Sequence, residues 1–181
     1  MRGKVLGTIA LAAIALSSVA SSARADTRFA ARLGLYGSSS YQSRALADNK
    51  GLIAGFQYTL AGVPAVLNGE QWSTVISADY YMQLTEDSVK FQGVPVSIAQ
   101  VYTFEEQNGM TPFAGFCVTA VTYKSDLVTP HQPWLTRFGG GLILGLNINE
   151  KMFLEGRYEM FDKHGAAGTP EGFRAVFGYR F

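Results

Sequence analysis

The residues most able to do chemistry are charged side chains that recur at alternate positions within apolar stretches. Such spacing places the charges on one face of a β-strand and the apolar residues on the other, because successive side chains of a strand point to opposite faces. Acids and bases that share an enclosed face can pair across strands. We therefore expect an interior charge network made of Arg28, Arg32, Asp79, Arg137, Glu155, Arg157, Glu159, Arg174 and Arg180.

Groups able to act as a nucleophile, a general base or a metal ligand are scarce. The two histidines, His131 and His164, fall in expected loops, and neither stands in a His-x-Ser arrangement. Cys117 is the single cysteine, so no intrachain disulfide can form, and it is expected to pack as a small hydrophobe. No EF-hand, phosphate-loop, HExxH or paired-cysteine pattern is present. We expect no enzyme, no cofactor and no metal site.

The N-terminus is typical of a secretory signal peptide. Arg2 and Lys4 precede a mostly apolar run over residues 5–16, and Ala23-Arg24-Ala25 fits an A-x-A cleavage site. The run is short for a membrane anchor, which needs roughly 20 residues. We therefore expect residues 1–25 to be a cleaved signal peptide, with Ala23 and Ala25 marking the cleavage site, and residues 26–181 to form one domain.

Composition narrows the class of the mature domain. The chain has 181 residues, of which 48% are hydrophobic, 16% charged and 13% aromatic. Cleavage would remove three of the 15 basic residues and leave 12 against 14 acids, a net charge of −2. Because this balance offers no basic footprint, we expect no nucleic-acid partner. Low charge with many aromatic residues suits a membrane β-barrel, in which half of each strand is polar.

Period-two alternation predicts eight strands, at about 27–37, 52–60, 72–84, 94–104, 111–124, 134–148, 152–161 and 172–181. Most are close to the roughly 9–11 residues that a membrane-spanning strand needs. Longer polar loops, including a charged one at 85–90, are expected after strands one, three, five and seven, with generally shorter turns elsewhere. That is the pattern of outer-membrane barrels, and it leaves both termini in the periplasm.

Alternation does not by itself say which face points inward. A soluble barrel points apolar residues inward, but an eight-stranded barrel has an interior that side chains only just fill. Arginine on a lipid-facing surface near the membrane midplane would cost about 2–4 kcal/mol. We therefore expect an all-β fold: an eight-stranded antiparallel up-and-down transmembrane β-barrel with charges inside and apolar faces in lipid.

Three further observations concern which side chains point inward and which point outward. Both faces of the fifth strand are apolar, and Lys124 indicates that its own face points inward. Gln100 interrupts the apolar face of the fourth strand. Rings near the strand ends are expected in aromatic girdles at the membrane interfaces, and these are Trp72, Phe104, Phe113, Trp134, Phe161 and Phe181.

Four segments of the second half resemble a known family. They are the Thr-Pro-Phe-Ala-Gly opening at 111–115, the glycine-rich strand and turn over 138–151, the segment 154–159 and the closing Gly-Tyr-Arg-Phe at 178–181. This pattern resembles small OmpA/OmpX-like outer-membrane proteins, the outer-membrane protein β-barrel domain. The resemblance implies that the barrel assembly machinery reads the last strand, at Phe177, Tyr179 and Phe181.

These features predict a protein of the bacterial outer membrane with a charge-filled, plugged interior and a structural or surface-interaction role. A narrow porin-like or OmpW-like channel for small solutes is the first alternative. A lipid A-modifying enzyme that uses His131 or His164 is the second. The expected partners are outer-membrane lipids and the assembly machinery, the surface partner is left open, and a closed barrel is expected to be a monomer.

Overall fold

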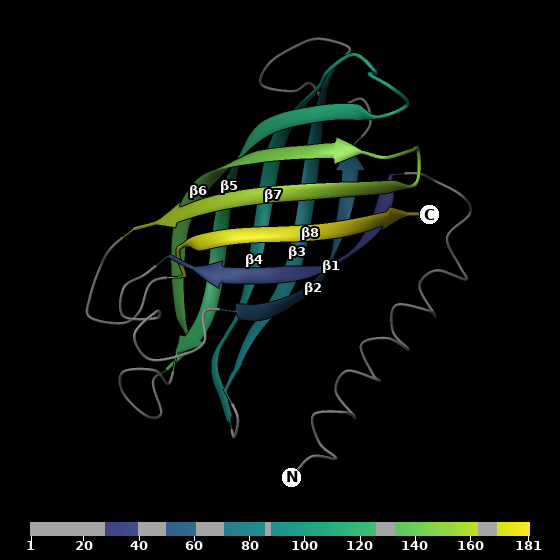
Figure 1. Ribbon diagram of the computed structural model, residues 1–181. Coiled ribbons are helices and arrows are strands. Elements are labelled where there is room, and N and C mark those ends of the chain that lie inside the picture. Colours follow the sequence, from purple (N-terminus) through teal and green to yellow (C-terminus); the bar gives the residue numbers. More distant parts are fainter. Residues whose placement is uncertain (1–27, 40–49, 61–70, 86–87, 126–132, 163–169) are drawn as a thin grey trace.

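The chain folds as a closed barrel of eight antiparallel strands, which confirms the predicted fold class (Figure 1). The computed structural model describes residues 28–39, 50–60, 71–85, 88–125, 133–162 and 170–181. Each strand pairs with its neighbours in sequence, and β8 pairs with β1 to close the sheet. The strands are β1 (Phe29–Ser38), β2 (Lys50–Leu60), β3 (Trp72–Thr85), β4 (Ser88–Thr103), β5 (Thr111–Ser125), β6 (Leu135–Asn147), β7 (Met152–Phe161) and β8 (Gly172–Arg180).

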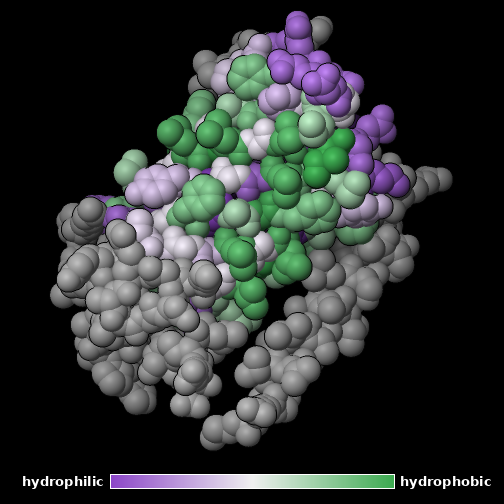
Figure 2. All heavy atoms as spheres, in the orientation of Figure 1, coloured by the Kyte–Doolittle hydropathy of each residue, from purple (hydrophilic) through white to green (hydrophobic). Residues whose placement is uncertain are grey.

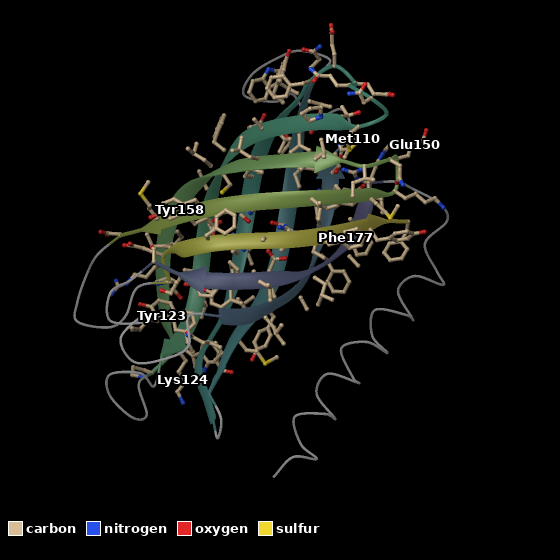
Figure 3. The ribbon with its side chains drawn as sticks, viewed as in Figure 1. Met110, Tyr123, Lys124, Glu150, Tyr158 and Phe177 are labelled. Carbon is tan, nitrogen blue, oxygen red and sulfur yellow. The ribbon has the colours of Figure 1, made fainter. Side chains whose placement is uncertain are left out.

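The two ends of the barrel differ in their connections. We call the end that holds Phe29, Phe181 and the connections 104–110 and 148–151 the turn end, and the opposite end the loop end. Met110 and Glu150 lie at the turn end in Figure 3, and Lys124 lies at the loop end. The predictions for residues 1–25, with Ala23 and Ala25, and for His131 and His164 concern positions outside the described residues.

Two turns at the turn end follow from local sequence chemistry. Asn108 (φ 53°) and Gly109 (φ 79°) are both left-handed, and the flanking Gln107 and Met110 form a β-bridge. Positive φ at both central residues is the requirement of a type I′ hairpin, which Asn-Gly meets best. In the next turn, Asn149 Oδ1 accepts hydrogen bonds from the backbone N–H groups of Lys151 (2.9 Å) and Met152 (2.8 Å).

The third and fourth strands are longer than the sequence predicts. β3 reaches Thr85 and β4 already begins at Ser88, with a register shift between Gln83 and Leu84, so the expected charged loop over 85–90 is wrong. Clustered charges suggest a loop, but a ladder is held by main-chain groups, which pair whatever the side chains are. The fourth strand therefore starts six residues before its predicted start at about 94.

Apolar side chains form the outside of the barrel. Leu142 is 69% exposed, Phe138 68% and Val118 66%, and β8 alternates between buried and exposed positions up to its last residue, Arg180, which is half-buried. Figure 2 shows apolar side chains gathered over the visible face of the barrel, with hydrophilic ones at one end. Contiguous apolar surface of this extent marks an interaction with a membrane or another protein. In the described part of the chain, no helix has the length and hydropathy to cross a membrane.

The facing of β5 corrects one expectation. Phe113, Cys117, Val121 and Tyr123 point inward and are buried, whereas Val118 and Lys124 belong to the outward face. The inference from Lys124 was therefore wrong. This residue is the penultimate one of β5 at the loop end, beyond the most apolar part of the outer face, so its charge does not report on the facing of the strand.

Gln100 lies on the outward face, as its position in the alternation requires, yet it is only 7% exposed. Its Nε2 donates to Thr74 Oγ1 at 2.7 Å. The Trp72 ring packs nearby against Phe116, with ring centroids 6.5 Å apart. A polar pair is thus tolerated on the outer wall because the two side chains satisfy each other beside aromatic rings.

The expected aromatic girdle is partly wrong. Phe113 and Phe161 are each 6% exposed and point into the barrel, where they join its apolar interior. Phe104 and Trp134 are exposed, at 45% and 51%. Phe113 and Phe161, whose side was predicted wrongly, stand at inward positions near the ends of their strands, where they pack against other apolar side chains of the lumen.

Candidate functional site

The interior of the barrel is built in three layers. A smaller-residue apolar cluster lies toward the turn end, and its members are Ala30, Val75, Ala99, Val101, Phe113, Cys117, Ile143 and Phe153. An aromatic cluster lies toward the loop end, and its members are Tyr36, Ile53, Tyr81, Phe91, Val121, Tyr123, Phe161 and Val176. Buried charged residues from β1, β3, β7 and β8 lie between them.

The buried charges form a closed ring in which three arginines alternate with three carboxylates. Arg32 bridges Glu155 (2.7 Å) and Asp79 (3.6 Å). Arg174 bridges Asp79 (3.0 Å) and Glu159. Arg157 bridges Glu159 (3.8 Å) and Glu155 (3.0 Å), which closes the circuit. We call these six residues the charge ring.

Hydroxyl groups extend the charge ring toward the other wall of the lumen. Arg157 Nη1 donates to Ser97 Oγ at 2.7 Å, and Ser97 shares a 2.9 Å hydrogen bond with Ser77. Thr119 Oγ1 donates to Glu159 Oε1 at 2.7 Å. The ring therefore spans the lumen from β7 and β8 to β3, β4 and β5.

The charge ring is balanced and buried, since three arginines meet three carboxylates and all six residues are at most 5% exposed. Removing ions from water costs several kcal/mol each, and pairing recovers this cost only when the geometry is good. Such a ring adds little net stability compared with an apolar core of equal volume. Removing one member of the ring lowers the free energy of unfolding strongly, however, because a buried charge is left without its partner.

A glycine opposite the ring makes room for it. Gly55 on β2 pairs with Asp79 on β3, and a Cβ at that position would overlap Asp79 Oδ1 and the neighbouring backbone. The close approach of carboxylate to main chain thus requires a residue without a side chain at this point.

Three residues predicted for the network lie outside the ring. Arg28 is exposed at the turn end, and Arg137 is half-buried on β6 opposite Val121, toward the loop end. Arg180 is half-buried at the turn end, where it donates to Asn147 Oδ1 (2.6 Å) and to the carbonyl oxygen of Glu150 (3.2 Å). The structure brings together the remaining six of the nine residues.

Stacked rings lie across the lumen on the loop side of the charge ring. The ring centroids of Tyr36 and Tyr81 are 4.8 Å apart, those of Tyr81 and Phe91 are 5.4 Å apart, and those of Phe91 and Tyr123 are 5.6 Å apart. Tyr36 Oη also donates to the carbonyl oxygen of Glu171 at 3.1 Å. The four rings come from β1, β3, β4 and β5, so they connect the walls across the lumen.

The turn end is hollow by contrast. A cavity of about 440 Å³ enters the barrel there and reaches Glu155 and Arg157 of the charge ring. Sequence reasoning missed it, although small inward residues on β3 and β4 signal it. The lining residues are Arg28, Gln57, Thr59, Ser73, Val75, Ala99, Val101, Thr103, Phe113, Asn147, Glu150, Glu155, Arg157 and Arg180.

The last strand presents its aromatic residues outward. Phe177 is 41% exposed and Tyr179 40%, and both lie on the same face of β8. The Phe181 backbone N–H donates to the carbonyl oxygen of Phe29 at 3.0 Å, which continues the seam between the two ends of the chain. Phe177 projects from the outside of β8 in Figure 3.

Reactive groups are few in the described part of the chain. Cys117 is 4% exposed and packs in the turn-end apolar cluster, with Sγ 3.7 Å from the carbonyl oxygen of Gly141. No group of three or more His, Cys, Asp or Glu side chains among the described residues is arranged to hold a metal ion.

Comparison with known proteins identifies the fold. No protein-family model and no curated protein sequence matches the chain. Among the solved structures that do match is the crystal structure of Neisserial surface protein A (NspA), with a TM-score of 0.58 and 16% sequence identity. The match covers 84% of this chain and 96% of that one. At this identity the similarity establishes the fold alone.

Proposed function

We propose that the chain is an integral protein of the bacterial outer membrane. The apolar belt around the barrel supports this, since exposed residues such as Leu142 and Phe138 would face lipid there. The likeness to NspA, a Neisserial surface protein, points the same way. In this proposal residues 1–25 are a signal peptide, the turn end faces the periplasm and the loop end faces outward.

The proposed role is structural or surface-interacting, without transport and without catalysis. The observation that carries it is the closed charge ring stacked against the aromatic layer, both of which are buried. A pore needs a continuous hydrated path, and two buried layers that lie across the lumen support the proposal that this barrel has none. The loops would then meet other surfaces while the barrel anchors them.

Assembly follows from the same proposal. Phe177, Tyr179 and Phe181 on the last strand would be the signal read by the barrel assembly machinery. The outward position of Phe177 and Tyr179 supports this, because both rings remain available on the outer wall. A closed barrel has no free strand edge, so the proposed state is a monomer in contact with outer-membrane lipids.

Two measurements test the proposal. The native protein should partition into detergent rather than buffer and should migrate differently on a gel before and after boiling. If it stays in the aqueous phase and migrates identically, the membrane assignment fails. In planar lipid bilayers the folded protein should give no steady single-channel openings, with a boiled sample as the control for detergent leakage. Steady openings would overturn the closed interior.

A narrow channel is the second candidate, and the turn-end cavity is the observation that favours it. The cavity already reaches Glu155 and Arg157, so the remaining barrier is the charge ring and the aromatic layer above it. The same bilayer recording separates the two proposals, because a channel would open repeatedly with a defined conductance.

A further inference from the structure

The turn-end cavity has two chemically different walls. Val75 on β3, Val101 on β4 and Phe113 on β5 give it a largely apolar wall, in which Ser73 and Thr103 are the polar members. Thr59, Asn147 and Arg180 give it hydrogen-bonding groups on the other strands. Its volume of about 440 Å³ falls within the range of small-molecule pockets, which is roughly 300–1,000 Å³. A guest that fits both walls must carry an apolar body and a polar head.

Arg180 determines the charge of that head. Its Nη2 donates to Asn147 Oδ1 at 2.6 Å, and its Nη1 donates to the backbone carbonyl of Glu150 at 3.2 Å. Its Cζ lies 4.7 Å from the centre of the Phe153 ring. These partners are formally neutral, and within the described residues Arg180 forms no ion pair. The guanidinium is therefore held in place while its positive charge is not neutralised.

The fixed guanidinium retains donors for a guest. Arginine has five N–H donors in one plane, and the hydrogen bonds to Glu150 and Asn147 occupy two of them. Planar guanidinium groups bind carboxylate and phosphate oxygens well, often through two parallel hydrogen bonds. The rim thus favours an anion.

We infer that the turn-end cavity binds a small organic anion with an apolar body, its carboxylate on Arg180 and its body against Val101 and Phe113. Glu155 and Arg157 close the inner end of the cavity, so the guest enters and leaves by the turn end and does not cross the barrel. This goes beyond the proposed function, because a closed structural barrel needs no guest.

Calorimetry on the full folded protein in zwitterionic micelles tests the inference, with phenylacetate as the probe. Phenylacetate should bind, whereas 2-phenylethanol, phenethylammonium and inorganic phosphate should bind at least about tenfold more weakly, since each lacks either the charge or the apolar body. Equal binding of phenylacetate and 2-phenylethanol, or of phenylacetate and phosphate, would overturn the inference. The absence of phenylacetate binding would overturn it as well.

Variants locate the site. Arg180→Gln should weaken phenylacetate binding by about tenfold or more, because one charged hydrogen-bonding partner is lost. Lys151→Gln is the matched control, since it removes one positive charge from an exposed residue at the same end that does not line the cavity, and binding should change less than about twofold. Equal effects of the two variants would show a diffuse charge effect and contradict the site.

A second variant covers the case in which Arg180→Gln does not fold. Val101→Phe places a larger apolar side chain in the cavity and leaves the surface charge unchanged. The folded variant, verified by its heat-modifiable migration, should lose phenylacetate binding by about tenfold or more. Unchanged binding to a folded Val101→Phe protein would place the guest elsewhere.

Discussion

The two halves of the lumen solve the same packing problem in opposite ways. On the loop side of the charge ring, Tyr36, Tyr81, Phe91 and Tyr123 stack and fill the space. On the turn side, the inward positions of β3 and β4 carry Ser73, Val75, Ala99, Val101 and Thr103, and a cavity of about 440 Å³ remains. The strands are continuous through both halves, so the two halves differ in the size of their inward side chains.

This difference shows that the barrel shape does not determine what the lumen contains. An eight-stranded barrel encloses a space that side chains can just fill, or that can hold one small ligand. In this chain a packed region and a hollow region occur in one barrel, separated by a layer of paired charges. That division can be broken at the layer itself, within either half, or at the glycine that makes room for the ring.

The largest effect is expected when the dividing layer is broken. Asp79→Ala leaves Arg32 and Arg174 without the carboxylate that joins them, and losing one partner of a buried pair costs about 3–5 kcal/mol. The free energy of unfolding can be measured by urea titration in micelles, followed by tryptophan fluorescence. Glu106→Ala, at an exposed position in the 104–110 connection, should change it by less than about 0.5 kcal/mol. Similar losses for both variants would mean that the ring is not a structural unit.

A matched phenylalanine pair compares the two halves directly. Phe91→Ala on the loop side should cost about 4 kcal/mol, because it opens a void within a packed aromatic stack. Phe113→Ala should lower the free energy of unfolding by at least about 1 kcal/mol less than Phe91→Ala does, because the space it leaves joins a cavity that already exists. Both can be measured by the same urea titration. A larger loss for Phe113→Ala would contradict the contrast between a solid and a hollow half.

The smallest effect concerns the room that the ring requires. Gly55→Ala should destabilise the barrel by about 1–3 kcal/mol, because the added Cβ overlaps Asp79 and the backbone. Gly156→Ala on the outer face is the control. Its Cβ would lie 3.2 Å from the tip of the Phe173 side chain, which is 53% exposed and able to move, so the change should stay below about 0.5 kcal/mol. Equal losses would indicate a general glycine effect.

The sequence predicts the strand number and most of the facing, because the outer wall is apolar along its length while charges sit at alternate positions. It fails where that contrast disappears. The inward face of β5 carries Phe113, Cys117 and Tyr123, and the outward face carries Phe116 and Val118, so neither face is marked by polarity. Phe113 and Phe161 were misplaced for the same reason, since the lumen is itself apolar on both sides of the ring.

The charged residues were predicted as a set, but their order around the ring was not predictable. Arg32 on β1 meets Asp79 on β3 and Glu155 on β7, and none of these strands adjoins another in the sheet. Such contacts depend on the tilt and stagger of the strands and on side-chain length, which residue spacing does not reveal. The cavity was not predicted because it depends on the sizes of the inward residues rather than on their polarity.

The last strand both closes the sheet and, through Arg174, completes the charge ring. Arg174 lies on β8 and joins Asp79 of β3 to Glu159 of β7, so the circuit of charges is incomplete until the final strand has docked on β1. Without β8, the three carboxylates of the charge ring would share only Arg32 and Arg157, which leaves one negative charge uncompensated. Charge pairing therefore favours barrel closure. Partly closed forms that lack the final strand are disfavoured both by the uncompensated charge inside the lumen and by the missing hydrogen bonds along the seam with β1.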